Sequence, residues 1–312
     1  MKKFLGLIVF AALLSGCDDG EIQVKALNFS DATAQNCGNI IYKLNGTEAL
    51  FFQIPYETSF LNDATPVGTP ITIPIDGTAN HRIFYRAYNG PVAAANICET
   101  VQPGTPQITE EWNATSGNID ITSTAVTVAN TTPGFEGGEK IIRYRHSIVF
   151  RNVTYQNGQI ETFYDFGTYD TTPSALPFNF DDQIDKCDSS NTIYNYNGSE
   201  AITLNIDPAL ILSQITPAGS PRIGAISDTE NSVSYRTFAG QILASYFCTT
   251  PAPTTPAISQ QWDAIDGTIE VTTTTNGTGF LHEIHLKNVH LKKGNSSFLL
   301  ATDYLLGNLI TN

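Results

Sequence analysis

Short hydrophobic runs alternate with turn-forming residues along most of the chain. The runs NIIYKLNG (39–46), EALFFQI (48–54) and RIFYRAY (82–88) are rich in β-branched and aromatic residues, which favour strands. Asn45-Gly46 separates the first two runs, and this dipeptide is typical of a tight hairpin turn. No stretch keeps a 3.6-residue hydrophobic period over three helical turns, so the pattern predicts an all-β protein.

The same order of runs occurs twice. Residues 81–124 and 231–274 align without a gap, which we interpret as an internal duplication. The matched positions include Tyr85/Tyr235, Arg86/Arg236, Gly90/Gly240, Cys98/Cys248, Pro106/Pro256, Trp112/Trp262 and Gly117/Gly267. About eight short strands in each copy, separated by frequent turns, predict two tandem antiparallel β-sandwich domains. Strand spacing alone leaves a barrel open.

The repeat also divides the chain. We expect a signal peptide at 1–16, an acidic tether at 17–22, one β-sandwich at 23–168, a linker at 169–176 and a second β-sandwich at 177–312. A linker this short limits the relative orientations of the two domains. The first copy also carries a Gly-rich stretch around residues 131–140 that the second copy lacks.

Four of the five cysteines occupy matching places in the two copies. The same number of residues separates Cys37 from Cys98 and Cys187 from Cys248. This spacing predicts one disulfide in each domain and therefore an oxidising compartment. Four buried thiols are the alternative. A zinc site is disfavoured, because no CxxC motif or Cys/His cluster accompanies these cysteines.

The fifth cysteine, Cys17, ends an N-terminal leader. Lys2 and Lys3 precede an apolar run that is too short to span a bilayer. The run ends in Leu14-Ser15-Gly16-Cys17, which resembles the lipobox of bacterial lipoproteins. The resemblance implies cleavage before Cys17 and its acylation, and hence attachment to a membrane through a lipid anchor. An ordinary secretory signal is the alternative.

An acidic run, Asp18-Asp19-Gly20-Glu21, follows the cysteine. It is similar to the export signal of surface lipoproteins in Bacteroidota, and the whole chain resembles their surface lipoproteins of unknown function. The resemblance implies an outer-membrane lipoprotein exposed at the cell surface, with a periplasm-facing protein as the alternative. The acidic run is also interpretable as a solvated tether. In enterobacteria, an Asp after the lipidated cysteine implies retention at the inner membrane instead.

Charge and motifs narrow the function. The chain has 16 Lys and Arg against 30 Asp and Glu, a formal net charge of −14, which disfavours binding to nucleic acid. It has no GxSxG elbow, HExxH motif, Walker loop or GxGxxG after a strand. We therefore assign no catalytic residue. A pair of carboxylates that hydrolyses glycosides stays open, since tertiary structure alone positions such a pair.

Comparing the two copies separates structural residues from functional candidates. Trp112/Trp262 and His146/His282 occur in both copies, so we expect them to serve the fold. Tyr196 replaces a leucine of the first copy and shares a strand face with Tyr194. Tyrosine rings stack on sugars, so this pair is a candidate ligand site. Half-buried packing is the alternative.

Two groups of residues are candidate metal ligands. Asp181, Asp182 and Asp185 form an acidic loop that offers part of a calcium cage. Glu283 and His285 lie two residues apart, on one face of a predicted strand, where they could share a metal. A solvated loop and a solvated strand face are the simpler interpretations. We therefore expect no cofactor, with calcium as the exception.

Taken together, these patterns predict a membrane-anchored envelope or surface lipoprotein that acts without catalysis, in binding, adhesion or assembly. Its expected partner, besides the membrane, is a glycan or an envelope protein. A glycan-binding accessory lipoprotein is the first alternative, and a hydrolase that uses Asp or Glu is the second.

Overall fold

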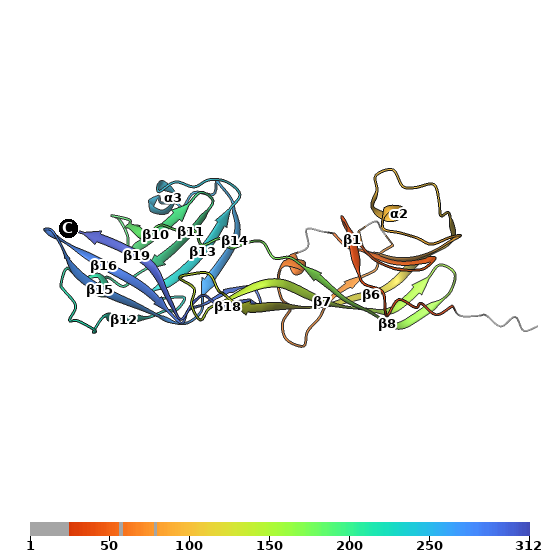
Figure 1. Cartoon of the computed structure of the whole chain (residues 1–312), viewed down its shortest axis with the longest axis horizontal. Coiled ribbons are helices and arrows are strands. Elements are labelled where there is room, and N and C mark those ends of the chain that lie inside the picture. Colours follow the sequence, from red (N-terminus) through yellow and green to blue (C-terminus); the bar gives the residue numbers. More distant parts are fainter. Residues whose placement is uncertain (1–24, 56–58, 78–79) are drawn as a thin grey trace, which may run out of the picture.

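The computed structural model describes residues 25–55, 59–77 and 80–312. The predicted signal peptide, Cys17 and the acidic tether lie outside these residues. The described chain is all-β and forms two curled sheets at opposite ends of an elongated molecule (Figure 1). We call the parts that contain them the N-terminal half (residues 25–171) and the C-terminal half (residues 172–312).

In the N-terminal half the described residues form an eight-stranded sheet with the order β1-β2-β3-β5-β6-β7-β8, and β4 pairs with β6. The elements are β1 (Gln35–Cys37), β2 (Ile40–Asn45), β3 (Glu48–Gln53), η1 (Ser59–Asn62), β4 (Ile71–Pro74), β5 (Arg82–Tyr88), α2 (Ala95–Cys98), β6 (Ile108–Ala129), β7 (Glu139–Tyr155) and β8 (Ile160–Thr171). β6 belongs to two layers, because its first residues pair with β5 and its later residues pair with β4 and β7.

In the C-terminal half the described residues form an 11-stranded sheet with the order β12-β15-β16-β19-β9-β10-β11-β13-β14-β17-β18. The elements are β9 (Gln183–Lys186), β10 (Thr192–Asn197), β11 (Glu200–Asn205), η2 (Pro208–Ile211), β12 (Arg222–Ala225), β13 (Ser232–Phe238), α3 (Ser245–Cys248), β14 (Ile258–Ala264), β15 (Thr268–Asn276), β16 (Gly279–Lys287), β17 (His290–Lys293), β18 (Ser296–Leu299) and β19 (Asp303–Thr311).

The predicted all-β, two-layered fold is confirmed, with one correction. Strand pairs in the described chain are antiparallel except β9 with β19, which is parallel. β9 pairs with β10 on one side and with β19 on the other, so this short strand joins the two layers along one edge. The local pattern of hydrophobic and polar residues does not predict this contact, because β9 and β19 lie far apart in the sequence.

A glycine bends the chain between the layers at the same place in both halves. In the N-terminal half, Gly117 has φ +127° and lies within β6; in the C-terminal half, Gly267 has φ +106° and lies between β14 and β15. A Cβ on Gly117 would lie 2.8 Å from the Cα of Val153, and one on Gly267 would lie 2.7 Å from Cγ2 of Val289. Both the backbone angle and the close packing therefore require glycine.

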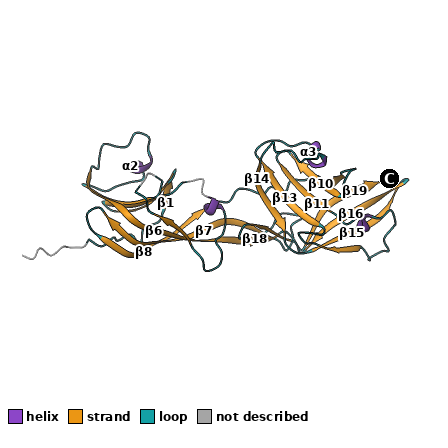
Figure 2. Cartoon of the chain, turned by 180° about the vertical axis from the view of Figure 1, so that it is seen from behind, coloured by secondary structure: helices purple, strands orange, loops and turns teal. Residues whose placement is uncertain are grey.

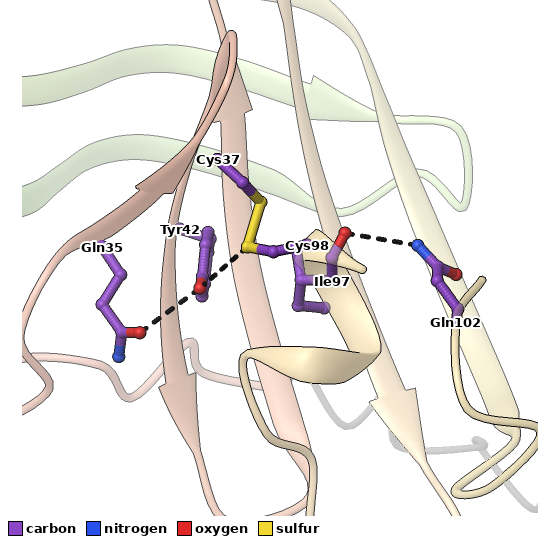
Figure 3. Close-up of a disulfide and its surroundings, with 6 residues drawn as sticks. All are labelled: Gln35, Cys37, Tyr42, Ile97, Cys98 and Gln102. Atoms are coloured by element: carbon purple, nitrogen blue, oxygen red, sulfur yellow. Dashed lines mark hydrogen bonds between the residues drawn. A yellow bond between two sulfur atoms is a disulfide. The ribbon is translucent and has the colours of Figure 1, made fainter. Parts of the chain in front are cut away.

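Both predicted disulfides are present. Cys37 bonds to Cys98, and Cys187 bonds to Cys248, each pair 61 residues apart. In the N-terminal half the bond ties the loop that carries α2 to β1, beside the Tyr42 ring, whose hydroxyl lies 3.3 Å from Sγ of Cys98 (Figure 3). Each disulfide thus fixes a long loop over the outer face of its sheet.

The tryptophans and histidines shared by the two copies serve the fold, as expected. Trp112 is 4% exposed and Trp262 is 2% exposed. Both histidines are fully buried between two hydroxyl groups. The contacts are His146 with Ser123 Oγ (2.6 Å) and Thr171 Oγ1 (2.9 Å), and His282 with Thr273 Oγ1 (2.9 Å) and Thr311 Oγ1 (2.9 Å). Burial lowers the pKa of His146 to about 4, against a small opposing effect of Asp170.

The Gly-rich stretch of the first copy joins the two halves. It forms the turn between β6 and β7, and its Phe135 packs into the hydrophobic core of the C-terminal half, 5.3 Å from the Tyr304 ring. The carbonyl of Glu136 accepts a hydrogen bond of 3.0 Å from the backbone N–H of Thr302. A Cβ on Gly138 would lie 2.1 Å from the carbonyl oxygen of Leu300, so close backbone contact explains the glycine.

A second contact between the halves involves the loop after η1. Asp63 accepts hydrogen bonds from the hydroxyl of Ser296 (2.5 Å) and the backbone N–H of Asn295 (3.1 Å). Lys293 donates to the carbonyl of Asn62 (2.8 Å). Figure 2 shows β18 beside the long β6–β7 hairpin, which it contacts. The two halves therefore meet through packed side chains as well as through the linker.

Candidate functional site

A groove on the outer face of the C-terminal sheet is the candidate functional site. Residues of β10, β11, β13 and the loop that carries α3 line it, and its volume is about 260 Å³. Figure 1 shows where this loop and these strands lie in the C-terminal half. The strands contribute Thr192, Thr203, Asn205, Ser232, Ser234 and Arg236, and the loop contributes Tyr246, Phe247 and Ala252. The groove therefore has a polar floor and an aromatic wall.

Strand geometry explains the polar floor. Ser232, Ser234 and Arg236 alternate along β13 with the fully buried Val233 and Tyr235, so they point to the opposite face of the sheet. Across the ladder, the register places Thr203 opposite Ser234 and Asn205 opposite Ser232. Side chains directly opposite each other on one face lie close together. Hydroxyl and amide groups from two strands are thus gathered on one small surface.

A hydrogen-bond network holds this floor in place. Ser234 donates to Asp263 Oδ1 (2.6 Å), and Gln261 donates to the same carboxylate (2.9 Å). Arg236 donates from Nε to Gln261 Oε1 (2.9 Å). Among the described residues, no carboxylate forms an ion pair with Arg236. Its terminal N–H groups are therefore available for a hydrogen-bond acceptor in the groove.

The face is filled in the N-terminal half. Phe51 on β3 and Phe84 on β5 lie directly opposite each other, stacked with ring centroids 4.4 Å apart and almost fully buried. The guanidinium of Arg86 lies 5.1 Å from the Phe84 ring centroid. The equivalent positions of the C-terminal half carry Thr203 and Ser234. Replacing two stacked phenyl rings by two small hydroxyl side chains is what opens the groove.

The matching arginines of the two faces, Arg86 and Arg236, also have different partners. In the N-terminal half, Arg86 forms an ion pair of 2.6 Å with Glu111. The C-terminal half has Gln261 at the position of Glu111, so the corresponding Arg236 receives an uncharged partner. The C-terminal face is thus both hollower and more able to bind an acceptor group.

The predicted ligand residues Tyr194 and Tyr196 lie beside this groove, on β10. Tyr194 is 8% exposed, and its ring stacks on Phe247 with centroids 4.6 Å apart. Tyr196 lies 5.7 Å from the same ring. Burial raises the pKa of Tyr194. Both tyrosines therefore pack against Phe247, which belongs to the aromatic wall. Stacking of a sugar on Tyr194 and Tyr196 stays a prediction.

The structure brings the predicted pair Glu283 and His285 into contact, whereas Asp181, Asp182 and Asp185 make separate contacts elsewhere. Among the described residues, no three His, Cys, Asp or Glu side chains are placed to hold a metal ion. Asp181 and Asp182 accept hydrogen bonds through their backbone carbonyls, from Asn195 and Asn308, and Asp185 lies on β9. His285 lies between Asp303 Oδ1 (2.6 Å) and Glu283 Oε1 (3.2 Å).

Sequence reasoning missed the floor of the groove. The sequence comparison considered aromatic residues that occur in the second copy alone. The informative positions are Thr203 and Ser234, where the first copy has Phe51 and Phe84 instead. Both positions fall within runs that can be aligned between the copies. The missing information was that Phe51 and Phe84 face outward rather than into the core, which requires the strand register.

No family model matches the chain, and no curated protein or solved structure matches it either. Within the described part of the chain, no helix has the length and apolar character needed to cross a bilayer. What the fold and the groove define is a class: an all-β protein with two disulfide-braced sheets, one of which carries an open polar groove.

Proposed function

We propose that the protein is a lipid-anchored, non-enzymatic binding module of the bacterial envelope, and that its groove binds a glycan. The observation that carries this proposal is the exchange of the Phe51–Phe84 stack for Thr203 and Ser234. Stacked and buried rings stabilise the sheet. Their absence from the C-terminal face is therefore not explained by stability and suggests a role in binding. Opening this face exposes polar groups to a partner.

The chemistry of the groove suits a sugar. A sugar ring has hydroxyl groups around its edge and an apolar face of C–H groups. Thr203, Ser232 and Asn205 supply donors and acceptors for the hydroxyls. Tyr246 and Phe247 are half-buried and supply aromatic surface for the apolar face. A sugar that bears a carboxylate could also pair with the guanidinium of Arg236, whose Nε donates to Gln261 but whose terminal N–H groups stay available.

The groove offers binding groups rather than catalytic ones. Its lining contains no Asp, Glu, His, Cys or Lys side chain. General acid–base hydrolysis of a glycoside needs two carboxyl groups that flank the scissile bond. This lining favours retention of a glycan over its cleavage, in line with the proposed non-enzymatic role.

The leader supplies the proposed location. Acylation at Cys17 would hold the protein at the outer membrane, and the disulfides fit an oxidising compartment. A membrane anchor raises the effective concentration of the groove at the cell surface, so weak binding of a single sugar segment suffices. An envelope protein in contact with the same face, and a periplasm-facing orientation, are the alternatives.

The groove is tested by returning it to the state of the N-terminal half. In the double variant Thr203→Phe with Ser234→Phe, the new rings should stack as Phe51 and Phe84 do, and retention on polysaccharide columns should be lost. The matched control is Thr272→Phe, which adds a ring to an exposed position on β15. Unchanged thermal unfolding and circular dichroism would show that both variants are folded.

Retention of glycans by the double variant at the level of the natural chain would contradict the groove as the binding site. Location is tested separately by protease treatment of intact cells, with and without an inhibitor of lipoprotein signal peptidase. Loss of the protein from intact cells, with precursor accumulating under the inhibitor, is the expected result. Protection from protease would place the protein on the periplasmic side.

A further inference from the structure

A second and larger cavity lies where the two halves meet. Its volume is about 390 Å³, and its walls come from the β6–β7 hairpin, the linker after β8, and strands β14 and β18. The lining includes Phe135 of the hairpin, Phe178 from the segment that follows the linker, and Trp262 and Phe298 of the C-terminal half. The cavity therefore exists only while the two halves are docked.

One wall of the cavity carries a buried hydrogen-bond donor without a partner. Trp262 is 2% exposed, and its indole Nε1 has no hydrogen-bond partner. The matching Trp112 of the N-terminal half donates to Glu110 Oε1 at 2.8 Å. A buried polar group that lacks a partner is costly and uncommon in folded proteins. The difference at Trp262 therefore needs an explanation.

The residue at the position of Glu110 supplies part of that explanation. It is Gln260 in the C-terminal half, and it lines the same cavity as Trp262. Within the described chain, the Gln260 side-chain amide makes no hydrogen bond with any residue. The indole N–H of Trp262 and the side-chain amide of Gln260 thus line the same cavity, and neither makes a hydrogen bond within the described chain.

The lining of the cavity has a polar part and an apolar part. The polar part includes Asn130, Thr132, Glu139, Lys140, Thr172 and Ser174, whereas four aromatic rings and Leu300 form the apolar part. The rings of Trp262 and Phe298 contact each other edge to face at 5.2 Å, and those of Phe135 and Phe178 do so at 5.7 Å. Leu300, which is 1% exposed, completes this surface. A polyhydroxylated ligand would leave the hydroxyl groups that face this apolar part unpaired. An apolar body that lies on the aromatic rings, with an acceptor group beside Trp262 Nε1, fits this part better.

We propose that this junction cavity binds a fatty acid or a related acyl compound. The acyl chain lies among the aromatic and aliphatic walls, and the carboxylate accepts hydrogen bonds from Trp262 Nε1 and the Gln260 amide. Since both halves line the cavity, the ligand also stabilises their docking. This site is separate from the polar groove on β10, β11 and β13, and it does not depend on glycan binding.

The protein offers its own reporter for this site. The chain has two tryptophans, so Trp112→Phe leaves Trp262 as the only indole. We would titrate dodecanoate into the soluble chain that begins at Asp18 and keeps every described residue. The expected result is a saturable change in Trp262 emission with one molecule bound per chain. Isothermal titration calorimetry on the chain with both tryptophans gives the same stoichiometry if Trp112→Phe fails to fold.

Gln260→Glu tests the proposed head-group site. It gives Trp262 the partner that Trp112 has, and it places a negative charge beside the carboxylate of the ligand. We expect dodecanoate affinity to fall at least about tenfold. The matched control is the reverse change, Glu110→Gln, at the equivalent position of the N-terminal half, which should leave affinity unchanged. Gln260→Glu should also leave polysaccharide retention unchanged.

Three outcomes would overturn the proposal. Absence of saturable dodecanoate binding would mean that the cavity holds water only. Equal affinity in Gln260→Glu and the natural chain would mean that the acyl compound binds elsewhere. Loss of dodecanoate binding in the Thr203→Phe/Ser234→Phe variant would assign it to the polar groove instead. None of these results would change the glycan test, so the two proposals fail separately.

Discussion

The two halves of the molecule share a scaffold and differ in what covers it. Each has a disulfide that ties a loop across the outer face of its sheet. In the N-terminal half that face is closed by the Phe51–Phe84 stack, whereas in the C-terminal half Thr203 and Ser234 leave it open. Where two halves match in sequence and in fold, a candidate site is therefore recognised by a packing contact that is present in one half and absent from the other.

A second difference concerns the segments that lead into each sheet. In the N-terminal half, Glu48 accepts a hydrogen bond from the Tyr85 hydroxyl and pairs with the ammonium of Lys25. Burial tends to raise the pKa of Glu48, but these contacts lower it overall. In the C-terminal half, Glu200 accepts from the Tyr235 hydroxyl (2.7 Å). Its other donors are backbone amides.

Those amides belong to the segment after the linker. Phe178 and Asn179 each donate a backbone N–H to Glu200 at 2.9 Å, and the Phe178 ring stacks on Tyr235 at 4.0 Å. The segment that directly follows the linker is therefore docked on the C-terminal sheet. This docking is also what forms one wall of the junction cavity.

Removal of a disulfide should have the largest effect on stability. Removing each one in turn tests whether the two halves depend equally on their disulfides. Each closes a loop of the same length, with the two cysteines 61 positions apart in the sequence. Replacing Cys37 and Cys98 by Ala, or Cys187 and Cys248 by Ala, should each lower the free energy of unfolding by roughly 4 kcal/mol. Denaturant unfolding followed by circular dichroism would measure both. A negligible loss in either half would contradict the equivalence.

Phe135→Ala should affect the C-terminal half, although the residue belongs to the N-terminal hairpin. Phe135 is 9% exposed and packs on Phe178 and Tyr304. Its removal should lower the free energy of unfolding by about 3 kcal/mol, because it leaves a cavity in a hydrophobic core. Phe163→Ala is the matched control, since Phe163 is 53% exposed. Equal effects of the two substitutions would argue against the docked hairpin.

Acid should destabilise both halves through their buried histidines. The pKa of His146 is about 4 in the folded protein, against 6.5 for an unperturbed histidine. The unfolded chain therefore binds a proton below pH 6.5 that the folded chain excludes until pH 4. Stability should fall as the pH drops through this window, by roughly 3 kcal/mol for this group. Burial lowers the pKa of His282 in the same direction.

The pH effect is measured as the free energy of unfolding of the natural chain and of His146→Asn between pH 7 and pH 4. The asparagine side chain keeps hydrogen-bonding groups near Ser123 and Thr171 and removes the titration. A smaller loss of stability on acidification in the variant is expected. Identical pH profiles would show that protonation of His146 is not linked to unfolding.

The double change Gln261→Glu with Asp263→Asn gives the smallest effect on stability and sharpens the comparison at the groove. It copies Glu111 together with its hydrogen-bond partner Asn113, so the new carboxylate does not lie against Asp263, to which Gln261 donates. It supplies Arg236 with the ion pair that Arg86 makes with Glu111. This pair is partly exposed, so it should change the free energy of unfolding by less than about 1 kcal/mol. Glycan retention should nevertheless weaken, because the guanidinium becomes engaged. Unchanged retention would remove Arg236 from the site.

Much of the fold could be predicted from the sequence because matching residues occur at equal spacings in residues 81–124 and 231–274. Matching cysteines gave both disulfides, and the shared Trp and His positions proved to be buried. The parallel contact of β9 with β19 and the docking of Phe135 could not be predicted. Each joins residues far apart in the chain, and no local pattern encodes such a pairing.

The groove could not be predicted from the sequence for a different reason. Hydrophobic alternation shows that Phe51 and Phe52 point to opposite faces of β3, but both are large and apolar. Sequence alone does not say that Phe52 faces the main core and Phe51 the disulfide-tied loop. Without that assignment, Thr203 and Ser234 look like ordinary solvated strand residues.

We propose that the outer face of the C-terminal sheet, and not its filled counterpart in the N-terminal half, binds a glycan. Chemical-shift mapping of the isotope-labelled soluble chain, titrated with a glycan that it retains, tests this most directly. The account predicts shifts clustered at Thr203, Ser232, Ser234 and Arg236, with Phe51 and Phe84 unaffected. Shifts at the N-terminal face, or spread evenly over both sheets, would contradict it.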